Sequence, residues 1–171
     1  MRTEPERLAS LVFETPLGAM QAQASVRGLR ELRFAGASDV AAGARDRGSG
    51  GGGAAVLAAC AVQLREYFAG VRERFELPLD PVGTAFQLRA WAALREIPFG
   101  ETRGYAEQAV AIGAPSAARA VGAANGRNPI AIVVPCHRVV GARGDLTGFS
   151  GGLDRKRRLL ELEGAWPLDR R

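Results

Sequence analysis

The chain has 171 residues, 47% of them hydrophobic, which is enough apolar material to bury a core and excludes a disordered chain. No apolar run approaches the roughly 20 residues that a membrane span needs, and the charged N-terminus lacks the apolar segment of a secretory signal. The net charge of +5 and the pI of about 10.2 favour a polyanionic partner such as nucleic acid, although an arginine-rich chain can also simply report a G+C-rich genome.

The first 34 residues alternate apolar and polar side chains in short runs. Residues 11–15, 20–25 and 29–34 are predicted strands because their apolar positions recur with a period of two. A turn at 16–18 separates the first two. The N-terminal part of the chain is therefore predicted to be a small antiparallel sheet.

A stretch of glycines and then a helix follow these strands. The glycine-rich segment at about 43–53 is predicted to be a flexible surface loop, since it has no side chains with which to pack. Residues 54–68 have helical periodicity, and Gly70 is the expected C-terminal cap. Cys60 lies on the apolar stripe of this helix, so we interpret it as a packing residue.

Composition changes near residues 81–83, where we place a domain boundary. Residues 1–82 are predicted to be an N-terminal α/β structural domain, and 83–171 a mainly helical C-terminal domain. The second domain begins with a predicted helix over 84–96. Its Trp91 is more simply explained by core packing than by ligand binding, because aromatic side chains are used mostly for burial.

The next elements have the lengths of a helix-turn-helix. A short helix over 105–112, a turn at 113–115 and a second helix over 116–124, with Ser116 as its N-cap, fit that pattern. The pattern alone is weak, because such corners are common in proteins that never meet DNA. The second helix carries one long side chain, Arg119, among alanines and glycine. Such a helix can approach a groove but cannot read a base sequence, so DNA binding should be nearly independent of sequence.

The most informative motif is Pro-Cys-His-Arg-Val at 135–139. It follows an apolar run, 130–134, which we interpret as a buried strand. Neighbouring His137 and Arg138 are the kinds of group that lower a thiol pKa and make Cys136 a nucleophile. The competing interpretation is that Cys136 is a small buried hydrophobe.

The chain's two cysteines and single histidine bound other chemistries. Two cysteines give no disulfide framework, which fits a reducing cytoplasm, and we expect a cytoplasmic protein. Four ligands are usual for structural zinc, so no such site is expected. No motif for a metal or a cofactor is present, and none is expected to take part in the reaction.

Further residues extend the motif through the C-terminal half, in order and with compatible spacing. They are Arg119-Ala120-Val121-Gly122, Asn128-Pro129-Ile130, Pro135 to Gly141, Thr147 to Leu153, Lys156, Leu159-Leu160 and Glu163-Gly164. Together they resemble the O6-alkylguanine-DNA alkyltransferases, over about residues 84–164 and more loosely in the N-terminal part.

The resemblance implies an α+β protein. Its N-terminal domain would be a small antiparallel sheet with a helix, ribonuclease H-like, and its C-terminal domain mainly helical with a DNA-binding helix-turn-helix. It implies repair by direct reversal, in which O6-alkylguanine, or O4-alkylthymine, is rotated out of double-stranded DNA and its alkyl group is moved to Cys136. The product thioether has no route of hydrolysis comparable to that of a thioester. One turnover per molecule is therefore expected. The protein is also expected to be a monomer.

The resemblance also assigns roles to five residues. Cys136 would accept the alkyl group, His137 would act as its base through a bridging water, and Glu163 would orient the imidazole. An indirect link fits local geometry, since adjacent side chains point in different directions. Asn128 would be a hinge, and Tyr105 would contact and help protonate the lesion base.

DNA contacts and a base pocket follow from the same resemblance. The expected DNA-binding residues are Arg119, as a finger that fills the vacated stack, with Ser116, Ala118, Ala120 and Gly122. The expected pocket residues are Val139, Phe149, Ser150 and Lys156. Many relatives have tyrosine where this chain has Phe149, so the stacking wall would remain while any role of a phenol hydroxyl would be lost.

Two other classes of function are weighed beside this one. A regulator or lesion sensor without chemistry would use the helix-turn-helix alone, but non-catalytic relatives carry tryptophan in place of the cysteine. A cysteine hydrolase would use Cys136 with His137, but such enzymes take their histidine from a distant part of the sequence.

Overall fold

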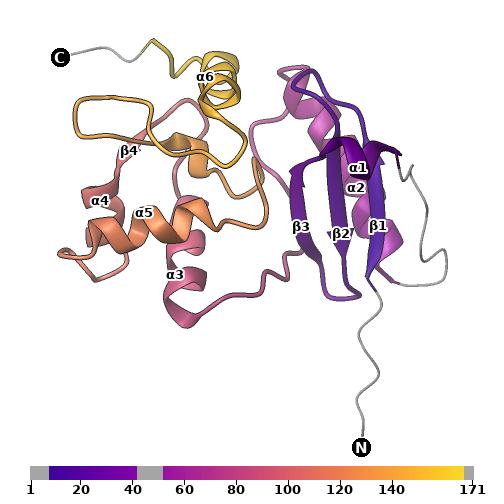
Figure 1. Cartoon of the computed structure of the whole chain (residues 1–171), viewed down its shortest axis with the longest axis horizontal. Helices are drawn as coiled ribbons and strands as arrows, with labels where there is room; N and C mark the ends of the chain where they lie inside the picture. The colour runs from indigo at the N-terminus through magenta and orange to yellow at the C-terminus, as the bar shows by residue number, and fades with distance from the viewer. Residues whose placement is uncertain (1–7, 42–51, 168–171) are drawn as a thin grey trace, which may run out of the picture. The chain divides into compact units, whose positions relative to one another are not determined.

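The computed structural model describes residues 8–41 and 52–167, which form an α+β protein of two compact units divided after Pro81 (Figure 1). The predicted glycine-rich loop at 43–53 lies outside the described residues except for its last two positions. Gly53 there begins a helix, so the prediction of a loop to that point is wrong. No helix in the described ranges has both the length and the apolar character needed to cross a membrane.

The first unit is built on a three-stranded antiparallel sheet with strand order β1-β2-β3. Its elements are β1 (Ala9–Phe13), β2 (Met20–Ala24), β3 (Leu29–Phe34), α1 (Ala37–Ala41) and α2 (Gly53–Phe68). The three predicted strands are confirmed, with ends moved by one or two residues. Met20, Ala22 and Ala24 of β2 are fully buried, because alternate residues of a strand point to the same face.

Helix α2 packs against this sheet (Figure 1). Its core-facing side chains recur every three or four residues, from Leu57 through Cys60 and Leu64 to Tyr67. Cys60 is fully buried, and burial raises the pKa of its thiol to about 12, which confirms it as a packing residue. The first residue of the helix, Gly53, lies so close to β2 that a Cβ there would be 2.6 Å from the carbonyl oxygen of Ala24. Only glycine fits at this position without a shift of the backbone.

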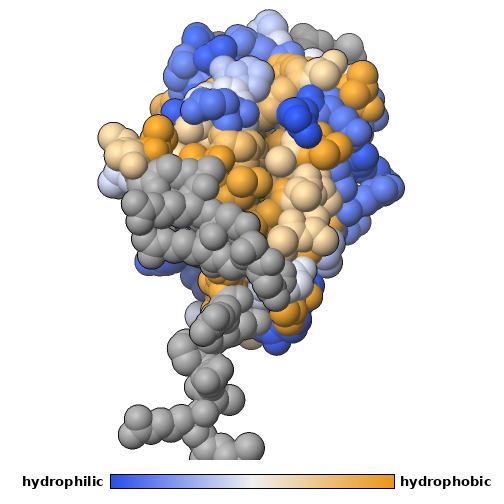
Figure 2. All heavy atoms as spheres, turned by 90° about the vertical axis from the view of Figure 1, so that its right-hand side faces the viewer, coloured by the Kyte–Doolittle hydropathy of each residue, from blue (hydrophilic) through white to orange (hydrophobic). Residues whose placement is uncertain are grey.

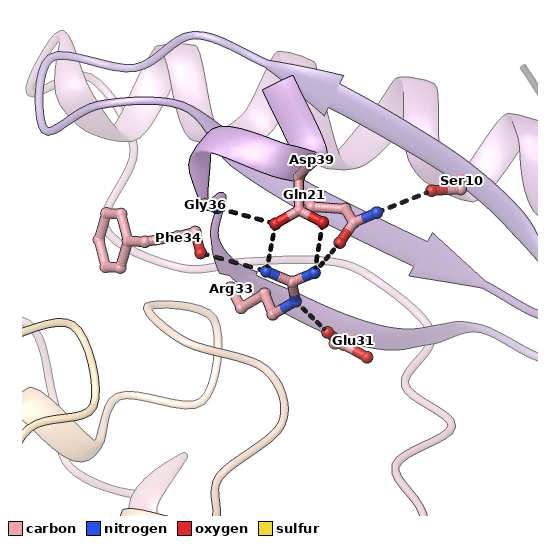
Figure 3. A network of polar contacts seen from close by, with 7 residues as sticks. All are labelled: Ser10, Gln21, Glu31, Arg33, Phe34, Gly36 and Asp39. Carbon is pink, nitrogen blue, oxygen red and sulfur yellow. Dashed lines mark hydrogen bonds and ion pairs between the residues drawn. The ribbon is translucent and has the colours of Figure 1, made fainter. Parts of the chain in front are cut away.

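Arg33 of β3 fastens the short helix α1 to the sheet (Figure 3). Its guanidinium binds both carboxylate oxygens of Asp39, at 2.8 and 2.9 Å, and also contacts Glu31 and Gln21. Asp39 in turn accepts the backbone N–H of Gly36 at 2.8 Å. The Arg33 hydrogen bonds, with that of Gly36, lower the pKa of Asp39 to about 2, so the carboxylate stays ionised and the clamp is charged at neutral pH.

The end of the first unit returns to the sheet. Leu29 N–H donates to the carbonyl of Pro78, and Asp80 N–H donates to the carbonyl of Leu29, both at 2.8 Å. The Asp80 carboxylate accepts from the Ser25 hydroxyl and pairs with Arg27. These bonds hold the chain to the sheet up to Asp80, next to the last residue of the unit.

Apolar side chains are also present on the surface of this unit. The exposed large ones are the valines Val26, Val40, Val62 and Val71. Figure 2 shows one face of the molecule, on which apolar side chains gather over the middle and hydrophilic ones lie around them. Single exposed apolar side chains such as these valines are normal on a protein surface.

The second unit is mainly helical. Its elements are α3 (Ala85–Leu94), β4 (Arg103–Gly104), α4 (Tyr105–Ala111), α5 (Ala118–Gly126), the 3₁₀ helix η1 (Cys136–Arg138), β5 (Val139–Val140) and α6 (Leu153–Leu162). β4 and β5 pair in parallel, with Arg103 opposite Val139. This pairing joins the start of α4 to the chain that follows the cysteine motif.

Buried polar groups join α3, α4 and α5. Trp91 of α3 donates its indole N–H to the carbonyl of Ala124 at 2.9 Å and is 3% exposed, which confirms that it packs in the core. Gln108 and Asn125 exchange two amide hydrogen bonds, of 3.0 and 2.7 Å, and Gln108 also donates to the carbonyl of Ala90. Every polar side chain here has a partner, as burial requires.

Helices α4 and α5 form the predicted helix-turn-helix, with one correction. Ser116 does not cap α5: Ala117 holds the N-cap position, and no side chain bonds to the end of the helix. The turn instead uses backbone bonds, in which Ala114 N–H reaches the carbonyl of Ala109 and Ala117 N–H reaches Ala114. Because the turn satisfies these groups by itself, the serine stays outside the helix.

The predicted buried strand over 130–134 is wrong. These residues are buried, but they form consecutive turns in which Val133 N–H bonds to Ala131 and Val134 N–H to Ile130. Ile132 has a φ of 70°, a left-handed conformation that a β-branched residue rarely adopts. An apolar run indicates burial, and here the buried segment is a series of turns that leads into η1.

Candidate active site

Cys136 begins the helix η1 and is 6% exposed. Asn128 donates its amide N–H to the thiol sulfur at 3.2 Å and to the carbonyl of Val134 at 2.7 Å. The amide oxygen of Asn128 accepts from Ile130 N–H, so the amide is fixed in orientation. Burial raises the pKa of Cys136, although the Asn128 bond and the positive charge of Lys156 oppose the rise. The resting thiol therefore keeps its proton until a base removes it.

His137 follows Cys136 in the chain, and its side chain is fully buried. Its Nε2 lies 2.8 Å from Oε1 of Glu163. Burial lowers the pKa of His137, so the ring is neutral. Because a carboxylate only accepts hydrogen bonds, Nε2 carries the proton and Nδ1 presents a lone pair. Nδ1 is the one buried side-chain nitrogen or oxygen, within the described part of the chain, that has no hydrogen-bond partner.

Glu163 is the C-terminal cap of α6 and lies in the interior with 4% exposure. Burial alone would raise the pKa of this carboxyl, but His137 and Arg138 outweigh burial and hold it at about 2. Arg138 donates to both carboxylate oxygens, from Nε at 2.8 Å and from Nη2 at 3.0 Å. The carboxylate is therefore ionised and held from two sides.

Arg138 does not act on Cys136 as the sequence motif led us to expect. Its guanidinium binds Glu163 and the carbonyl of Ile97, at 2.6 Å, and is almost fully buried. Positive charge reaches the thiol from Lys156 instead. Sequence reasoning missed the Arg138–Glu163 pair because its members are 25 residues apart in the chain.

Lys156 is fully buried and ties together two backbone segments near the site. Its ammonium donates to the carbonyl of Val139 at 2.5 Å and to that of Thr147 at 2.7 Å. Burial lowers the pKa of Lys156 to about 8. The Tyr105 hydroxyl also reaches Thr147, at 3.2 Å from its carbonyl oxygen and from its side-chain oxygen. Thr147 had no role in the sequence prediction, because its contribution is mainly a backbone carbonyl.

The remaining predicted pocket residues are Val139 in β5 and Phe149 and Ser150 in the segment between β5 and α6. The Phe149 ring meets His137 edge-on, with ring centroids 6.5 Å apart at 80°. Val139 is fully buried, and Ser150 is exposed. A cavity of about 760 Å³ opens nearby, lined in part by Tyr105 and by Gly141.

The predicted DNA-contacting residues lie on or beside α5. Arg119 and Ala120 are exposed, Ala118 is half-buried, and Ser116 is exposed in the preceding turn. Gly122 faces the Tyr105 ring, where an added Cβ would lie 3.6 Å from ring carbons. The helix thus presents one long cationic side chain on a surface of small residues.

Comparisons with known proteins give the family. Residues 10–81 match the ribonuclease-like domain of 6-O-methylguanine DNA methyltransferase, and residues 85–165 match its DNA-binding domain. A methylated-DNA–protein-cysteine methyltransferase from Mycobacterium tuberculosis is 65% identical over 101 residues, which is 59% of this chain. That stretch spans 61% of the relative's length.

Solved structures extend the likeness to almost the whole chain. An O6-methylguanine methyltransferase structure from Mycobacterium tuberculosis is 45% identical, with a TM-score of 0.78, and the match covers 95% of this chain and 97% of that one. The chain belongs to the O6-alkylguanine-DNA alkyltransferase family. An OGT structure from the same organism, solved in complex with DNA, is 46% identical over 91% of this chain and 92% of its own, with a TM-score of 0.78.

Proposed function

We propose that this alkyltransferase-family chain repairs DNA by direct reversal, moving the alkyl group of O6-alkylguanine, or O4-alkylthymine, to Cys136. The observation that carries the proposal is the buried series Cys136, His137 and Glu163. Within the described residues, Nδ1 of His137 is the only buried side-chain nitrogen or oxygen without a hydrogen-bond partner. A buried base with a free lone pair beside a protonated thiol is the arrangement that generates a thiolate on demand.

The proton and the alkyl group follow a balanced path. The thiol proton of Cys136 passes, through a bridging water, to Nδ1 of His137, and Glu163 stabilises the imidazolium that forms. The thiolate attacks the alkyl carbon, so a sulfur–carbon bond forms as the carbon–oxygen bond to the base breaks. The departing base takes up a proton, for which we propose the Tyr105 hydroxyl as the donor. The thioether product has no exit, so each molecule acts once.

The DNA-binding part is proposed from α5 and the second unit. A base inside a duplex cannot reach a buried thiol, so it must rotate out, at a cost of roughly a few kcal/mol. Arg119 is exposed among small residues, so it can enter the stack while the helix lies close to the groove. The likeness to an OGT structure in complex with DNA supports this placement. Phe149 and Val139 would line the pocket that receives the base.

The organisation of the chain is part of the same proposal. The first unit serves as a structural domain, and the second carries both DNA binding and alkyl transfer. We propose that the protein acts as a monomer in the cytoplasm, without a metal or a cofactor.

The test measures loss of O6-methylguanine from a duplex oligonucleotide as increasing amounts of protein are added. We expect one lesion removed per protein molecule, with none removed by Cys136→Ala. The matched control is Cys60→Ala, which removes the other cysteine and should keep full stoichiometry. Repair by Cys136→Ala, or continued turnover beyond one lesion per molecule, would overturn the proposal.

A further inference from the structure

Arg138, which the motif led us to expect beside the thiol, binds Glu163 instead and has no task in the proposed chemistry. It is buried, with 6% exposure, and it occupies both oxygens of Glu163 while its Nη1 donates to the carbonyl of Ile97. A guanidinium held at three points in the interior is a fixed charge that cannot lose its proton. Its position relative to Glu163 is therefore part of the electrostatics of the site.

Glu163 Oε1 is shared by two donors. It accepts from Nε2 of His137 at 2.8 Å and from Nη2 of Arg138 at 3.0 Å. A carboxylate whose only partner is an imidazole favours the doubly protonated ring, because the imidazolium is its natural counter-ion. Here the carboxylate already has a counter-ion in Arg138. The pull of Glu163 on a second histidine proton is correspondingly weaker.

We infer that Arg138 is a positioning residue which, by neutralising and orienting Glu163, keeps His137 in its singly protonated form with Nδ1 free to accept the thiol proton. The inference rests on the proposed function, since a free Nδ1 matters only if His137 acts as the base for Cys136. It adds a fourth member to the series, on the far side of Glu163 from the thiol. Without Arg138, Glu163 would attract a second proton to His137 more strongly, and burial and Lys156 alone would oppose it.

The groups around the His137 ring are consistent with this role. Burial lowers the pKa of His137, Glu163 raises it, and the charges of Arg138 and Lys156 lower it. Lys156 and Glu163 come from α6 and its cap, while Arg138 and Cys136 belong to η1 itself. Helix α3 also packs on η1, but its one charged residue, Arg89, is exposed and lies over the Phe86 ring.

The chain offers an unusually clean measurement, because His137 is its only histidine. Nitrogen-15 NMR of the imidazole reports both the tautomer and the pKa with no assignment problem and with no DNA present. For the unmodified protein we expect the Nε2–H tautomer. We also expect the ring to stay neutral at pH 6.5, because the pKa of His137 lies below the ordinary histidine value of about 6.5.

Three variants separate the role of charge from a structural role. Arg138→Met removes the counter-ion, and we expect the His137 pKa to rise by about one to three units. Arg138→Lys keeps a charge but not the two-point contact, so its shift should be smaller. The control, Arg158→Met, removes a charge from an exposed position of α6 and should leave the titration unchanged.

The rate of alkyl transfer supplies the second readout. If Arg138 acts through His137, the Arg138→Met rate should fall about tenfold or more further at pH 6 than at pH 8.5, because protonation removes the base only at low pH. A fall by the same factor at every pH would show a structural role and overturn the inference. If Arg138→Met does not fold, the His137 pKa and the pH dependence of the transfer rate are compared between the unmodified protein and Arg138→Lys, and that comparison tests the inference.

The two proposals fail in different ways. A His137 that titrates at or above pH 6.5 in the unmodified protein, or an Arg138 variant whose His137 pKa is unchanged or lower, overturns the inference even if DNA is repaired. The opposite result is a lowered His137 pKa that rises in Arg138→Met, together with no DNA repair by the unmodified protein. That result overturns the proposed function but leaves the effect of Arg138 on the His137 pKa standing.

Discussion

At the level of single residues, the site holds a thiol that is inactive by default. Burial raises the pKa of Cys136, and the two polar groups that oppose this, Asn128 and Lys156, do not outweigh it. A buried protonated thiol resists oxidation and unwanted alkylation, because the thiolate is the reactive form. In the proposed mechanism, activation depends on His137, whose Nδ1 has no hydrogen-bond partner while Nε2 is bonded to Glu163.

Asn128 provides the first test at this level. Asn128→Asp keeps the acceptor for Ile130 N–H but replaces the donor to the sulfur with a negative charge. We expect the pKa of Cys136 to rise further, and its alkylation by iodoacetamide at pH 7.5 to slow by about tenfold or more, since one pKa unit is tenfold in thiolate. Measuring it in a Cys60→Ala background leaves one thiol to follow. An unchanged rate would mean that the 3.2 Å contact does not stabilise the thiolate.

The sequence was sufficient to name the residues that meet, but not all of their partners. Cys136, His137, Glu163 and Asn128 were predicted to act together, and hydrogen bonds join Cys136 to Asn128 and His137 to Glu163. Arg138 was expected to act on the thiol, whereas it binds Glu163. Adjacency in a motif does not fix side-chain direction, so which of two neighbours a guanidinium reaches depends on tertiary packing.

At the level of elements, three helices are held around a reciprocal amide pair. Gln108 and Asn125 satisfy each other in the interior between α4 and α5. Replacing either one with leucine should cost about 1–3 kcal/mol in the free energy of unfolding, because the other amide is left buried without its partner. Replacing both should cost less than the sum of the single changes. Urea denaturation of the four proteins measures this, and strictly additive costs would show that the pair is not coupled.

Lys156 makes a prediction about the segment between β5 and α6. Its ammonium joins the carbonyls of Val139 and Thr147, so Lys156→Met should free residues 141–152. Two hydrogen bonds to a charged donor contribute about 1.5–3 kcal/mol each, so amide exchange in the segment should accelerate about tenfold or more. Hydrogen exchange with mass spectrometry reads this, with Arg158→Met as control. Unchanged exchange in 141–152 would show that other contacts hold the segment.

Two elements show where sequence reasoning stops. The helix over 84–96 was predicted, and the structure has a capping box at Thr84 and Gln87, both local features. The run 130–134 was predicted as a strand, yet it is a buried turn. Its apolar residues indicate burial in either case. The left-handed Ile132 and the short-range bonds of Asn128 to Ile130 and Val134 accompany the turn, and apolar periodicity does not predict either of them.

For the molecule as a whole, the buried charges of the site should set its acid stability. His137 has a folded pKa below its unfolded value of 6.5, so the folded state binds fewer protons and stability falls as pH drops below 6.5. Glu163 has a folded pKa of about 2 against 4.5, so the stability that it contributes is present above pH 4.5 and is lost as pH falls toward 2. Both groups act in the same direction.

Tryptophan fluorescence isolates this effect in the second unit, because the chain's two tryptophans, Trp91 and Trp166, both lie there. The urea midpoint should fall between pH 6.5 and pH 3. The Glu163 carboxyl accounts for a loss on the order of 3 kcal/mol over its full range, and Glu163→Gln should flatten the lower part of the profile. A variant with the same acid slope as the unmodified protein would show that Glu163 does not carry this dependence.

The central claim is that Cys136 is a one-time acceptor. It is tested most directly by the intact mass of the protein after incubation with an excess of duplex DNA that contains O6-methylguanine. We predict that every molecule gains one methyl group, that the gain stops at one, and that peptide mapping places it on Cys136 and not on Cys60. An unchanged protein mass, whether the DNA is repaired or only bound, would contradict the claim.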